Sequence, residues 1–387
     1  MSDEWAVRAG RLFDGRSFVD GSPVVVVQGG EVVEVTSDPA GLDVLELGDD
    51  VTLLPGLVDA HVHLSFDASA DLLAGFEVDD EALLQRMRES AATTLAAGVT
   101  TVRDLGDRSF LAVALAREID AGRTPGPTVL AAGPPLTTPG GHCYFLGGEV
   151  GDRAEMLAAV AERAEAGCAV VKVMVSGGNI TPGSLPWEAQ FHAEDLREVV
   201  REAHRLGLRT AGHVHGASSV VAALDAGFDT LEHVTFMTPD GIDAQEPVLQ
   251  RIADSGTFVS TTAGALPGAV PPPAIAARLQ LVLEMMSHQH ALGSRLVVGT
   301  DAGVGPGKPH GVMPHALRMV VSAGVDHVQA LRMMTSASAD ALGLSGRKGA
   351  LAPGADADLL AVRGDPSRDP DALLDVVAVW ARGTRVR

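Results

Sequence analysis

Residues 55–64 read Pro55-Gly56-Leu57-Val58-Asp59-Ala60-His61-Val62-His63-Leu64, an apolar run that carries two histidines. In a β-strand, residues two positions apart point to the same face, so His61 and His63 present their imidazoles to one point. This geometry is typical of metal ligands, although a buried pair held by hydrogen bonds would have the same spacing. The stretch therefore predicts a buried strand with two candidate metal ligands at its end.

Further apolar runs follow along the chain and alternate with helical patterns, which is typical of β-α-β units on a parallel sheet. Eight strand–helix repeats predict an α/β fold of the (β/α)8 TIM-barrel type, whose active site lies at the carboxyl ends of the strands. The predicted strands are 53–64, 100–105, 128–133, 169–176, 209–215, 230–235, 257–262 and 295–303. The clearest predicted helices are 80–97, 152–167, 193–207 and 273–293.

The two ends of the chain have a different pattern, with short strand-like runs separated by Gly and Asp turns. Neither end is long enough to bury a core alone, so we expect the two to pair. The sequence thus predicts a small discontinuous β-sandwich domain made of residues 1–52 and 348–387, and a barrel domain at 53–347.

Composition excludes several classes of protein. A net charge of −21 repels nucleic acid and anionic membranes, so we expect a small-molecule substrate. The first residues do not resemble a secretory signal, and no apolar run is long enough to span a membrane, which favours a cytoplasmic location. The only two cysteines, Cys143 and Cys168, are too few for a disulfide framework or a cysteine-rich zinc module.

Polar residues at the ends of the predicted strands are informative, because these positions are apolar unless they take part in chemistry. The neutral imidazoles of this set and the carboxylate of Asp301 suit zinc or a similar divalent ion. The set comprises His61, His63, Lys172, His213, His215, Glu232, His233 and Asp301.

Lys172 is the unusual member of this set. The chain contains only three lysines, Lys172, Lys308 and Lys348, and otherwise uses arginine for positive charge. A lysine, unlike an arginine, can react as the free amine with carbon dioxide to give a carbamate, an anionic ligand with two oxygens. The alternative for Lys172 is an ammonium group paired with a buried carboxylate.

Together these residues resemble the amidohydrolase superfamily of metal-dependent hydrolases, and most closely its imidazolonepropionase-related, prolidase-like branch, which includes dipeptidases and ochratoxinase. In that branch the lysine of the fourth strand is carboxylated and bridges two metal ions. The matching segments are PGLVDAHVHL at 55–64, AGVTTVRDLG at 97–106, VVKVMVSGG at 170–178, AGHVHG at 211–216, LEHVTF at 231–236, GTDAG at 299–303 and GALAPGADADLLAV at 349–362.

The resemblance implies a binuclear centre, most simply with two zinc ions. One ion would be held by His61, His63 and Asp301, and the other by His213 and His233. Lys172, as N6-carboxylysine, would bridge them. A hydroxide between the ions would be the nucleophile, because two cations lower the pKa of water toward neutrality. Asp301 would take its proton and pass it to the leaving amine.

Four residues are expected to contact the substrate. His215 lies two residues after His213 and is interpreted as a substrate or outer contact, with an exchange of the two as metal ligand left open. His142 occupies the position at which the branch has a substrate-contacting histidine, and it is expected to polarise the scissile carbonyl as a catalytic residue. Either His142 or Arg103 is expected to receive a substrate carboxylate. His310 follows the eighth strand and could line the mouth of the site.

We therefore expect an enzyme that hydrolyses an amide or peptide-type C–N bond in a dipeptide or N-acyl amino acid. The alternatives are a mononuclear cyclic-amide hydrolase or deaminase, an enzyme that acts on a lactone or carbamate ester, and a non-catalytic assembly protein. The metal content would discriminate among binuclear, mononuclear and metal-free proteins. Because relatives commonly assemble, a homo-oligomer is expected.

Overall fold

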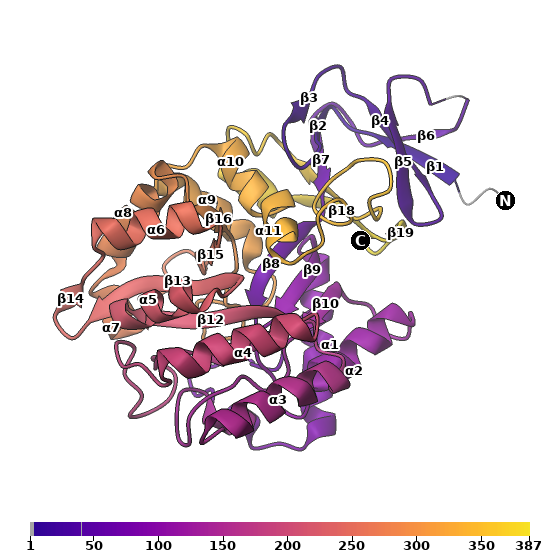
Figure 1. Cartoon of the computed structure of the whole chain (residues 1–387). Coiled ribbons are helices and arrows are strands. Elements are labelled where there is room, and N and C mark those ends of the chain that lie inside the picture. Colours follow the sequence, from indigo (N-terminus) through magenta and orange to yellow (C-terminus); the bar gives the residue numbers. More distant parts are fainter. Residues whose placement is uncertain (1–3, 40) are drawn as a thin grey trace.

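The computed structural model describes residues 4–39 and 41–387. Parallel strands lie at its centre and helices pack around them (Figure 1). All strand pairings between the predicted runs are parallel, which confirms the mixed α/β fold. One set, in spatial order, contains β10 (Thr128–Ala131), β9 (Val99–Asp104) and β8 (Leu57–Val62). The other contains β11 (Val170–Met174), β12 (Arg209–Gly216), β13 (Thr230–Thr238), β15 (Phe258–Ser260) and β16 (Arg295–Val297).

Backbone hydrogen bonds connect these two sets at both of their edges. At one edge, Ala169 N donates to the carbonyl oxygen of Ala131, and Leu136 N donates to that of Lys172. At the other edge, Ala60 N donates to the carbonyl oxygen of Val298 and Asp301 N to that of His61. These contacts bring the carboxyl ends of the parallel strands to the same side of the molecule.

The predicted strand at 53–64 is two strands in the structure, which is a correction. Residues Val51–Pro55 form β7, which belongs to a terminal sheet, and β8 begins at Leu57. The chain changes sheets at Gly56, where an added Cβ would lie 2.1 Å from Thr100 Oγ1. Only glycine fits so close an approach between neighbouring strands.

Helices follow most of the strands, and the predictions at 80–97, 152–167 and 193–207 are confirmed. The side chains of Asp79 and Asp152 cap two of them by accepting hydrogen bonds from main-chain nitrogens. The helices are α1 (Asp80–Ala96), α2 (Leu111–Asp120), α3 (Arg153–Ala166), α4 (Ala193–Arg205), α5 (Ala217–Ala226), α6 (Glu246–Ser255), α7 (Pro273–Ala276), α8 (Leu279–Ala291), α9 (Ala316–Ser322), α10 (His327–Met333) and α11 (Ser336–Ala341). Among the described residues, no helix is both long and apolar enough to cross a membrane.

The prediction of a single helix at 273–293 was wrong, because this segment forms two separate helices, α7 and α8. Arg278, between them, donates hydrogen bonds to the carbonyl oxygens of Thr238, Pro239, Gly241 and Ala274. These contacts anchor the junction to the turn between β13 and β14 (Gly241–Ile242). Because most of these hydrogen bonds join residues far apart in the sequence, the helical pattern of residues 273–293 does not predict the break between α7 and α8.

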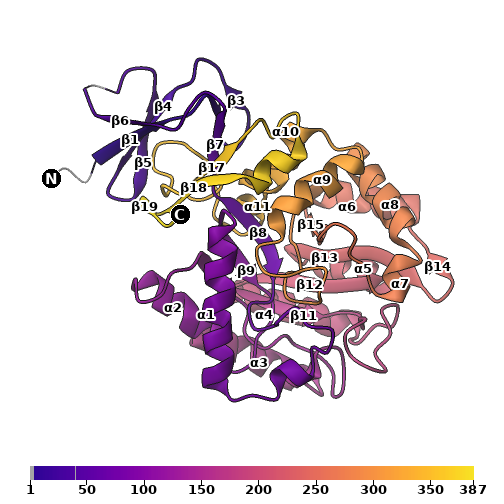
Figure 2. The ribbon, with the colours of Figure 1, turned by 180° about the vertical axis from the view of Figure 1, so that it is seen from behind.

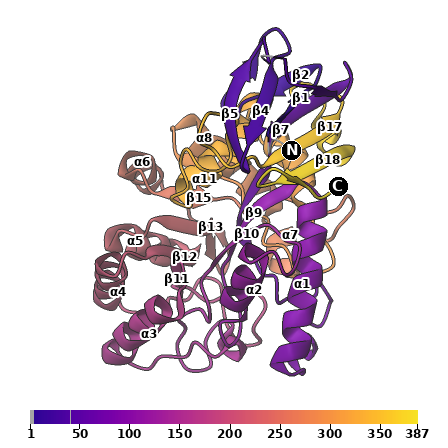
Figure 3. The same ribbon diagram turned by 90° about the vertical axis from the view of Figure 1, so that its right-hand side faces the viewer.

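The two chain ends lie together at one end of the molecule, where they form two sheets, one of which contains strands from both ends (Figures 2 and 3). Strand β17 (Leu359–Arg363) lies between β7 and β18 (Val376–Ala381), in a sheet with β2 (Arg11–Phe13), β3 (Phe18–Val19) and β19 (Thr384–Arg385). The other sheet contains β1 (Glu4–Arg8), β4 (Val24–Gln28), β5 (Glu31–Thr36) and β6 (Val44–Glu46). Both sheets contribute to one apolar core, which includes Val7, Val25, Leu53, Leu359 and Trp380.

Candidate metal centre

A first group of potential ligands lies where β8 ends. His61 Nε2 is 3.3 Å from His63 Nε2 and 3.5 Å from Asp301 Oδ1, and His63 Nε2 is 3.4 Å from the same oxygen. The strand alternation places both histidines on one face, and Asp301 arrives from the segment after β16. The predicted convergence of these three residues is confirmed.

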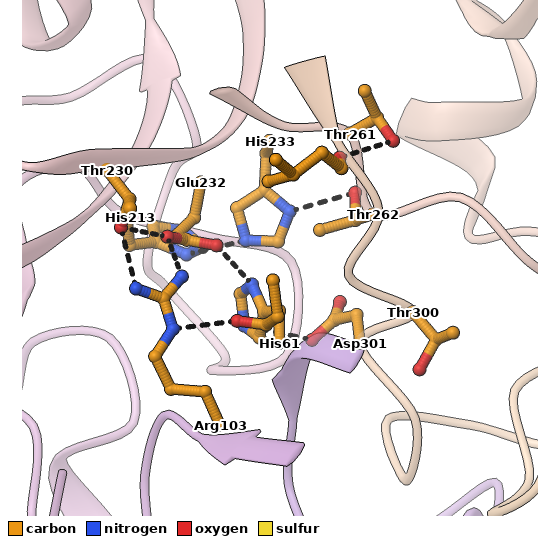
Figure 4. A network of polar contacts seen from close by, with 12 residues as sticks. His61, Arg103, His213, Thr230, Glu232, His233, Thr261, Thr262, Thr300 and Asp301 are labelled. Carbon is orange, nitrogen blue, oxygen red and sulfur yellow. Dashed lines mark hydrogen bonds and ion pairs between the residues drawn. The ribbon is translucent and has the colours of Figure 1, made fainter. Parts of the chain in front are cut away.

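The other ring nitrogens of the two histidines have acceptors that orient them. His61 Nδ1 is 2.9 Å from Glu232 Oε2 (Figure 4). His63 Nδ1 is 3.3 Å from the carbonyl oxygen of Gly106. A histidine that donates from Nδ1 keeps a lone pair on Nε2. Both Nε2 atoms are therefore suited to bind a metal ion.

A second group contains His213, His215 and His233, from β12 and β13. His213 Nδ1 and His233 Nε2 are 3.0 Å apart. The other ring nitrogens also have partners: His213 Nε2 is 3.1 Å from the carbonyl oxygen of Gly177, and His233 Nδ1 is 3.3 Å from Thr262 Oγ1. The His61 and His233 rings, with centroids 5.2 Å apart, bring the two groups together.

Burial favours the neutral form of His61, His213, His215 and His233. It lowers the pKa of His61 and that of His215 to about 4, and it holds those of His213 and His233 well below the usual value. Neighbouring histidines add to the effect for His213 and His233, since like charges repel. Neutral imidazoles have the lone pairs that divalent ions require.

Lys172 lies on β11 with its side chain fully buried. Burial lowers the pKa of its ammonium group to about 8, and its charge in turn lowers the pKa values of His61 and His233, one from each group. The nearby buried carboxylate, Glu232, is bonded to Arg103 at 2.8 Å. The charges of Glu232 and Asp301 raise the pKa of Lys172, but burial outweighs them.

Two candidate ligands have unusual main-chain conformations. Asp301 has φ of 60° and His233 has φ of 73°, in the left-handed region that non-glycine residues rarely adopt. Lys308 Nζ donates to the carbonyl oxygens of Thr300 and Thr262 at 2.7 and 2.8 Å, which ties together the two segments beside these residues. Strained conformations held by their surroundings are typical of functional sites.

The structure contradicts the expectation that Arg103 receives a substrate carboxylate. Its side chain is 1% exposed, and all three of its nitrogens donate to protein acceptors. These are the carbonyl oxygen of Ala60, Thr230 Oγ1 and Glu232 Oε1, at 2.8, 3.0 and 2.8 Å (Figure 4). From sequence we placed Arg103 at the strand top, but the tertiary structure gives it a partner across the strands.

His142 lies against the second group, with its ring centroid 4.8 Å from that of His213. Gln190 Oε1 accepts a hydrogen bond from His142 N and so fixes the loop. The imidazole is 2% exposed, and within the described chain its Nδ1 has no hydrogen-bond partner. An added Cβ at Gly178 would lie 2.3 Å from His142 Nε2, so the ring is closely packed.

His215 and His310 take different places. The His215 ring stacks on His233 with centroids 4.5 Å apart, and its Nδ1 is 2.8 Å from Thr235 Oγ1. His215 therefore lies beside the candidate ligands. His310 lies on the side of the first group, because its Nε2 faces the carbonyl oxygen of Phe66 at 2.8 Å and the Phe66 ring stacks on that of His63.

Sequence reasoning missed the roles of Glu232 and Lys308. Glu232 is an acidic residue within an apolar strand, and this position was the sequence feature that pointed to it. Lys308 is one of only three lysines, which was its signal. Neither feature predicts the hydrogen-bond partners of these residues, because the partners lie on distant segments of the chain.

Comparisons with known proteins agree with this geometry. The amidohydrolase family model matches residues 52–386. Ochratoxinase of Aspergillus niger is 26% identical over 375 residues, which cover 86% of this chain and 75% of ochratoxinase. The crystal structure of a Xaa-Pro dipeptidase with bound methionine in the active site has a TM-score of 0.88 and 27% identity, and covers 99% of this chain and 100% of that chain.

The crystal structure of A. niger ochratoxinase has a TM-score of 0.86 at 23% identity, over 100% of this chain and 95% of that chain, which shows a shared fold. The family resemblance of the sequence is thereby confirmed. The chain belongs to the amidohydrolase family, as an enzyme of its prolidase and ochratoxinase branch that acts on carbon–nitrogen bonds.

Proposed function

We propose that this protein is a binuclear metal-dependent amidohydrolase that cleaves an amide or peptide-type bond in a dipeptide or N-acyl amino acid. The observation that carries the proposal is the placement of two largely buried groups of potential ligands, one with His61, His63 and Asp301 and one with three histidines, at the same strand ends as a buried lysine. The dipeptidase and ochratoxinase similarities support this substrate class.

The donor atoms fit two divalent ions, most simply zinc. His61, His63 and Asp301 would hold one ion, and His213 and His233 the other, since their converging nitrogens and oxygen are the usual zinc donors. His215, the third member of the second group, lies close enough to His213 and His233 to replace His213 in the ligand set. When bound, the ions would lower the pKa of a water molecule and polarise the scissile carbonyl.

Lys172 would be the bridging ligand after carboxylation. Its neutral amine adds to carbon dioxide, one N–H proton is released, and an anionic carbamate results. Burial supports this step because it lowers the pKa of the amine to about 8, which increases the neutral fraction. An anion in this position also removes the repulsion between an ammonium group and the metal ions.

Asp301 is the proposed general base and general acid. Its Oδ1 lies within 3.5 Å of both histidines of the first group, and its side chain is 17% exposed, so substrate and water can reach it. His142, with an unpartnered Nδ1, and His215 would contact the substrate from the second group. His310 is proposed to line the mouth of the site.

We further propose that the eight parallel strands form a (β/α)8 barrel within residues 57–347, and that the terminal segments form a β-sandwich domain. The expected boundary between residues 52 and 53 moves to Gly56, because β7 belongs to the terminal sheet. The hydrogen bonds between β10 and β11, and between β8 and the segment after β16, support barrel closure. The core shared by the two terminal sheets supports the sandwich.

Metal analysis and a substrate screen test the function. Zinc-loaded protein should contain two ions per chain and hydrolyse members of a panel of dipeptides and N-acyl amino acids. Protein prepared under ¹³C-labelled bicarbonate should give a carbamate signal that is absent from Lys172→Ala. One ion per chain would favour the mononuclear alternative, and a metal-free, inactive protein would contradict the proposal.

A further inference from the structure

We propose that Arg103 and Glu232 are positioning residues for the metal centre. Glu232 fixes His61 with its proton on Nδ1, and Arg103 holds both Glu232 and the main chain beside His61. This inference rests on the proposed metal-dependent function. It assigns a role to two fully buried residues that no step of that function uses.

Every polar atom of the Glu232 carboxylate has a partner. Oε1 accepts from Arg103 Nη2 at 2.8 Å and from Thr230 Oγ1 at 2.6 Å, and Oε2 faces His61 Nδ1 at 2.9 Å (Figure 4). Thr230 Oγ1 accepts in turn from Arg103 Nη1 at 3.0 Å. The carboxylate therefore cannot rotate without breaking several buried hydrogen bonds.

The arrangement determines which nitrogen of His61 carries the proton. An ionised carboxylate only accepts hydrogen bonds, so His61 must donate from Nδ1. The lone pair is then on Nε2, which faces His63 and Asp301. Contacts of this kind orient metal-binding histidines and raise their basicity.

Arg103 serves two functions in this network. Its charge balances that of Glu232, which would otherwise be a buried, uncompensated anion. Its Nε donates to the carbonyl oxygen of Ala60, the residue before His61, and so holds the main chain of the ligand strand. The residues come from β8, β9 and β13, so the network also connects the two sets of parallel strands.

The nearly isosteric Glu232→Gln substitution separates positioning from packing. Arg103 and Thr230 both donate to the position of Oε1, so the glutamine oxygen must occupy it. The amide NH₂ group then faces the protonated Nδ1 of His61, so that two hydrogen-bond donors point at each other. His61 can relieve this conflict only by moving its proton to Nε2, which removes the metal-binding lone pair.

The experiment measures zinc affinity by competition with a chromophoric chelator, zinc stoichiometry by native mass spectrometry, and unfolding of the metal-stripped protein. We expect Glu232→Gln to weaken binding of one of the two zinc ions by about 10- to 100-fold. Arg103→Met should destabilise the metal-stripped protein, because it leaves Glu232 uncompensated. The double variant Arg103→Met/Glu232→Gln should recover stability but retain the weak zinc affinity.

Asp358→Asn is the matched control. Asp358 is a buried carboxylate that pairs with Lys348 at 2.9 Å and accepts from Arg382 N, away from the metal centre. This variant should lose stability without losing zinc affinity, and an equal loss of affinity in the control would overturn the inference. Two ions bound to Glu232→Gln with wild-type affinity would also overturn it and leave the proposed function intact. Wild-type protein that binds no zinc would overturn both.

Discussion

Thr300 donates two hydrogen bonds to Asp59, from its main-chain nitrogen to Oδ1 at 2.8 Å and from Oγ1 to Oδ2 at 2.6 Å. Asp59 lies two residues before His61, and Thr300 directly precedes Asp301. The same carboxylate also accepts from His61 N at 3.2 Å. This buried pair therefore holds the segments that carry the first group of ligands at a fixed distance from each other.

Thr300→Val should destabilise the protein, because it leaves an oxygen of the buried Asp59 carboxylate without its partner. Loss of such a bond costs about 1–3 kcal/mol, measured as the free energy of unfolding in urea. Thr101→Val is the control, since Thr101 is equally buried and its Oγ1 has no partner in the described structure. Equal losses in the two variants would show that the hydrogen bonds to Asp59 are not the cause.

Lys172→Ala should reduce kcat by about 10³-fold, the equivalent of the several kcal/mol that metal ions contribute to charge stabilisation. Millimolar acetate or propionate should restore part of the activity, because a small carboxylate supplies the same two-oxygen anion. Lys172→Arg keeps the positive charge but cannot form a carbamate, and should be inactive with or without the acid. Activity in Lys172→Arg would contradict the carbamate.

Removal of metal should abolish hydrolysis reversibly. Dialysis against a chelator should leave a folded protein with no activity, and two equivalents of zinc should restore it. Zinc at 100 times its dissociation constant should raise the free energy of unfolding by about 2.7 kcal/mol per site, measured as a shift in the unfolding midpoint. Full activity after complete removal, verified by elemental analysis, would contradict metal dependence.

Gly178→Ala should lower activity about as much as His142→Ala. An added Cβ at residue 178 would lie 2.3 Å from His142 Nε2, so the imidazole must leave its place. Gly241→Ala is the control, because no heavy atom lies within 4 Å of an added Cβ there. Steady-state kinetics with the best substrate of the panel measures the effect, and unchanged activity in Gly178→Ala would argue against a substrate contact by His142.

Asp229 should contribute stability that depends on pH. Burial opposes its ionisation, but hydrogen bonds from His204 and Thr210 outweigh burial and lower its pKa. A carboxylate with a lowered pKa stabilises the folded state above its unfolded pKa, near 3.8, and this contribution is lost as pH falls through the lower folded value.

The measurement compares unfolding midpoints of wild-type protein and Asp229→Asn at several pH values. The difference should be largest well above the unfolded pKa near 3.8 and shrink as pH falls through the lower folded value, since the carboxylate becomes protonated in both states. A difference that does not change with pH would show that the charge of Asp229 makes no contribution.

The alternation of strands and helices, and the polar residues near the strand ends, can be predicted from the amino-acid sequence alone. Both follow from local geometry, because side chains two apart on a strand share a face and a parallel strand buried on both faces is apolar. His61, His63, Lys172, His213, His233 and Asp301 were therefore identifiable as polar residues in apolar runs.

The hydrogen-bond partners of these residues could be identified only from the tertiary structure. Arg103 was expected at the substrate and instead pairs with Glu232, which lies 129 residues later in the chain. The tie between Asp59 and Thr300 spans 241 residues. No periodicity in sequence encodes such pairs, because they depend on how distant strands pack together and on the burial that makes each unpaired polar group costly.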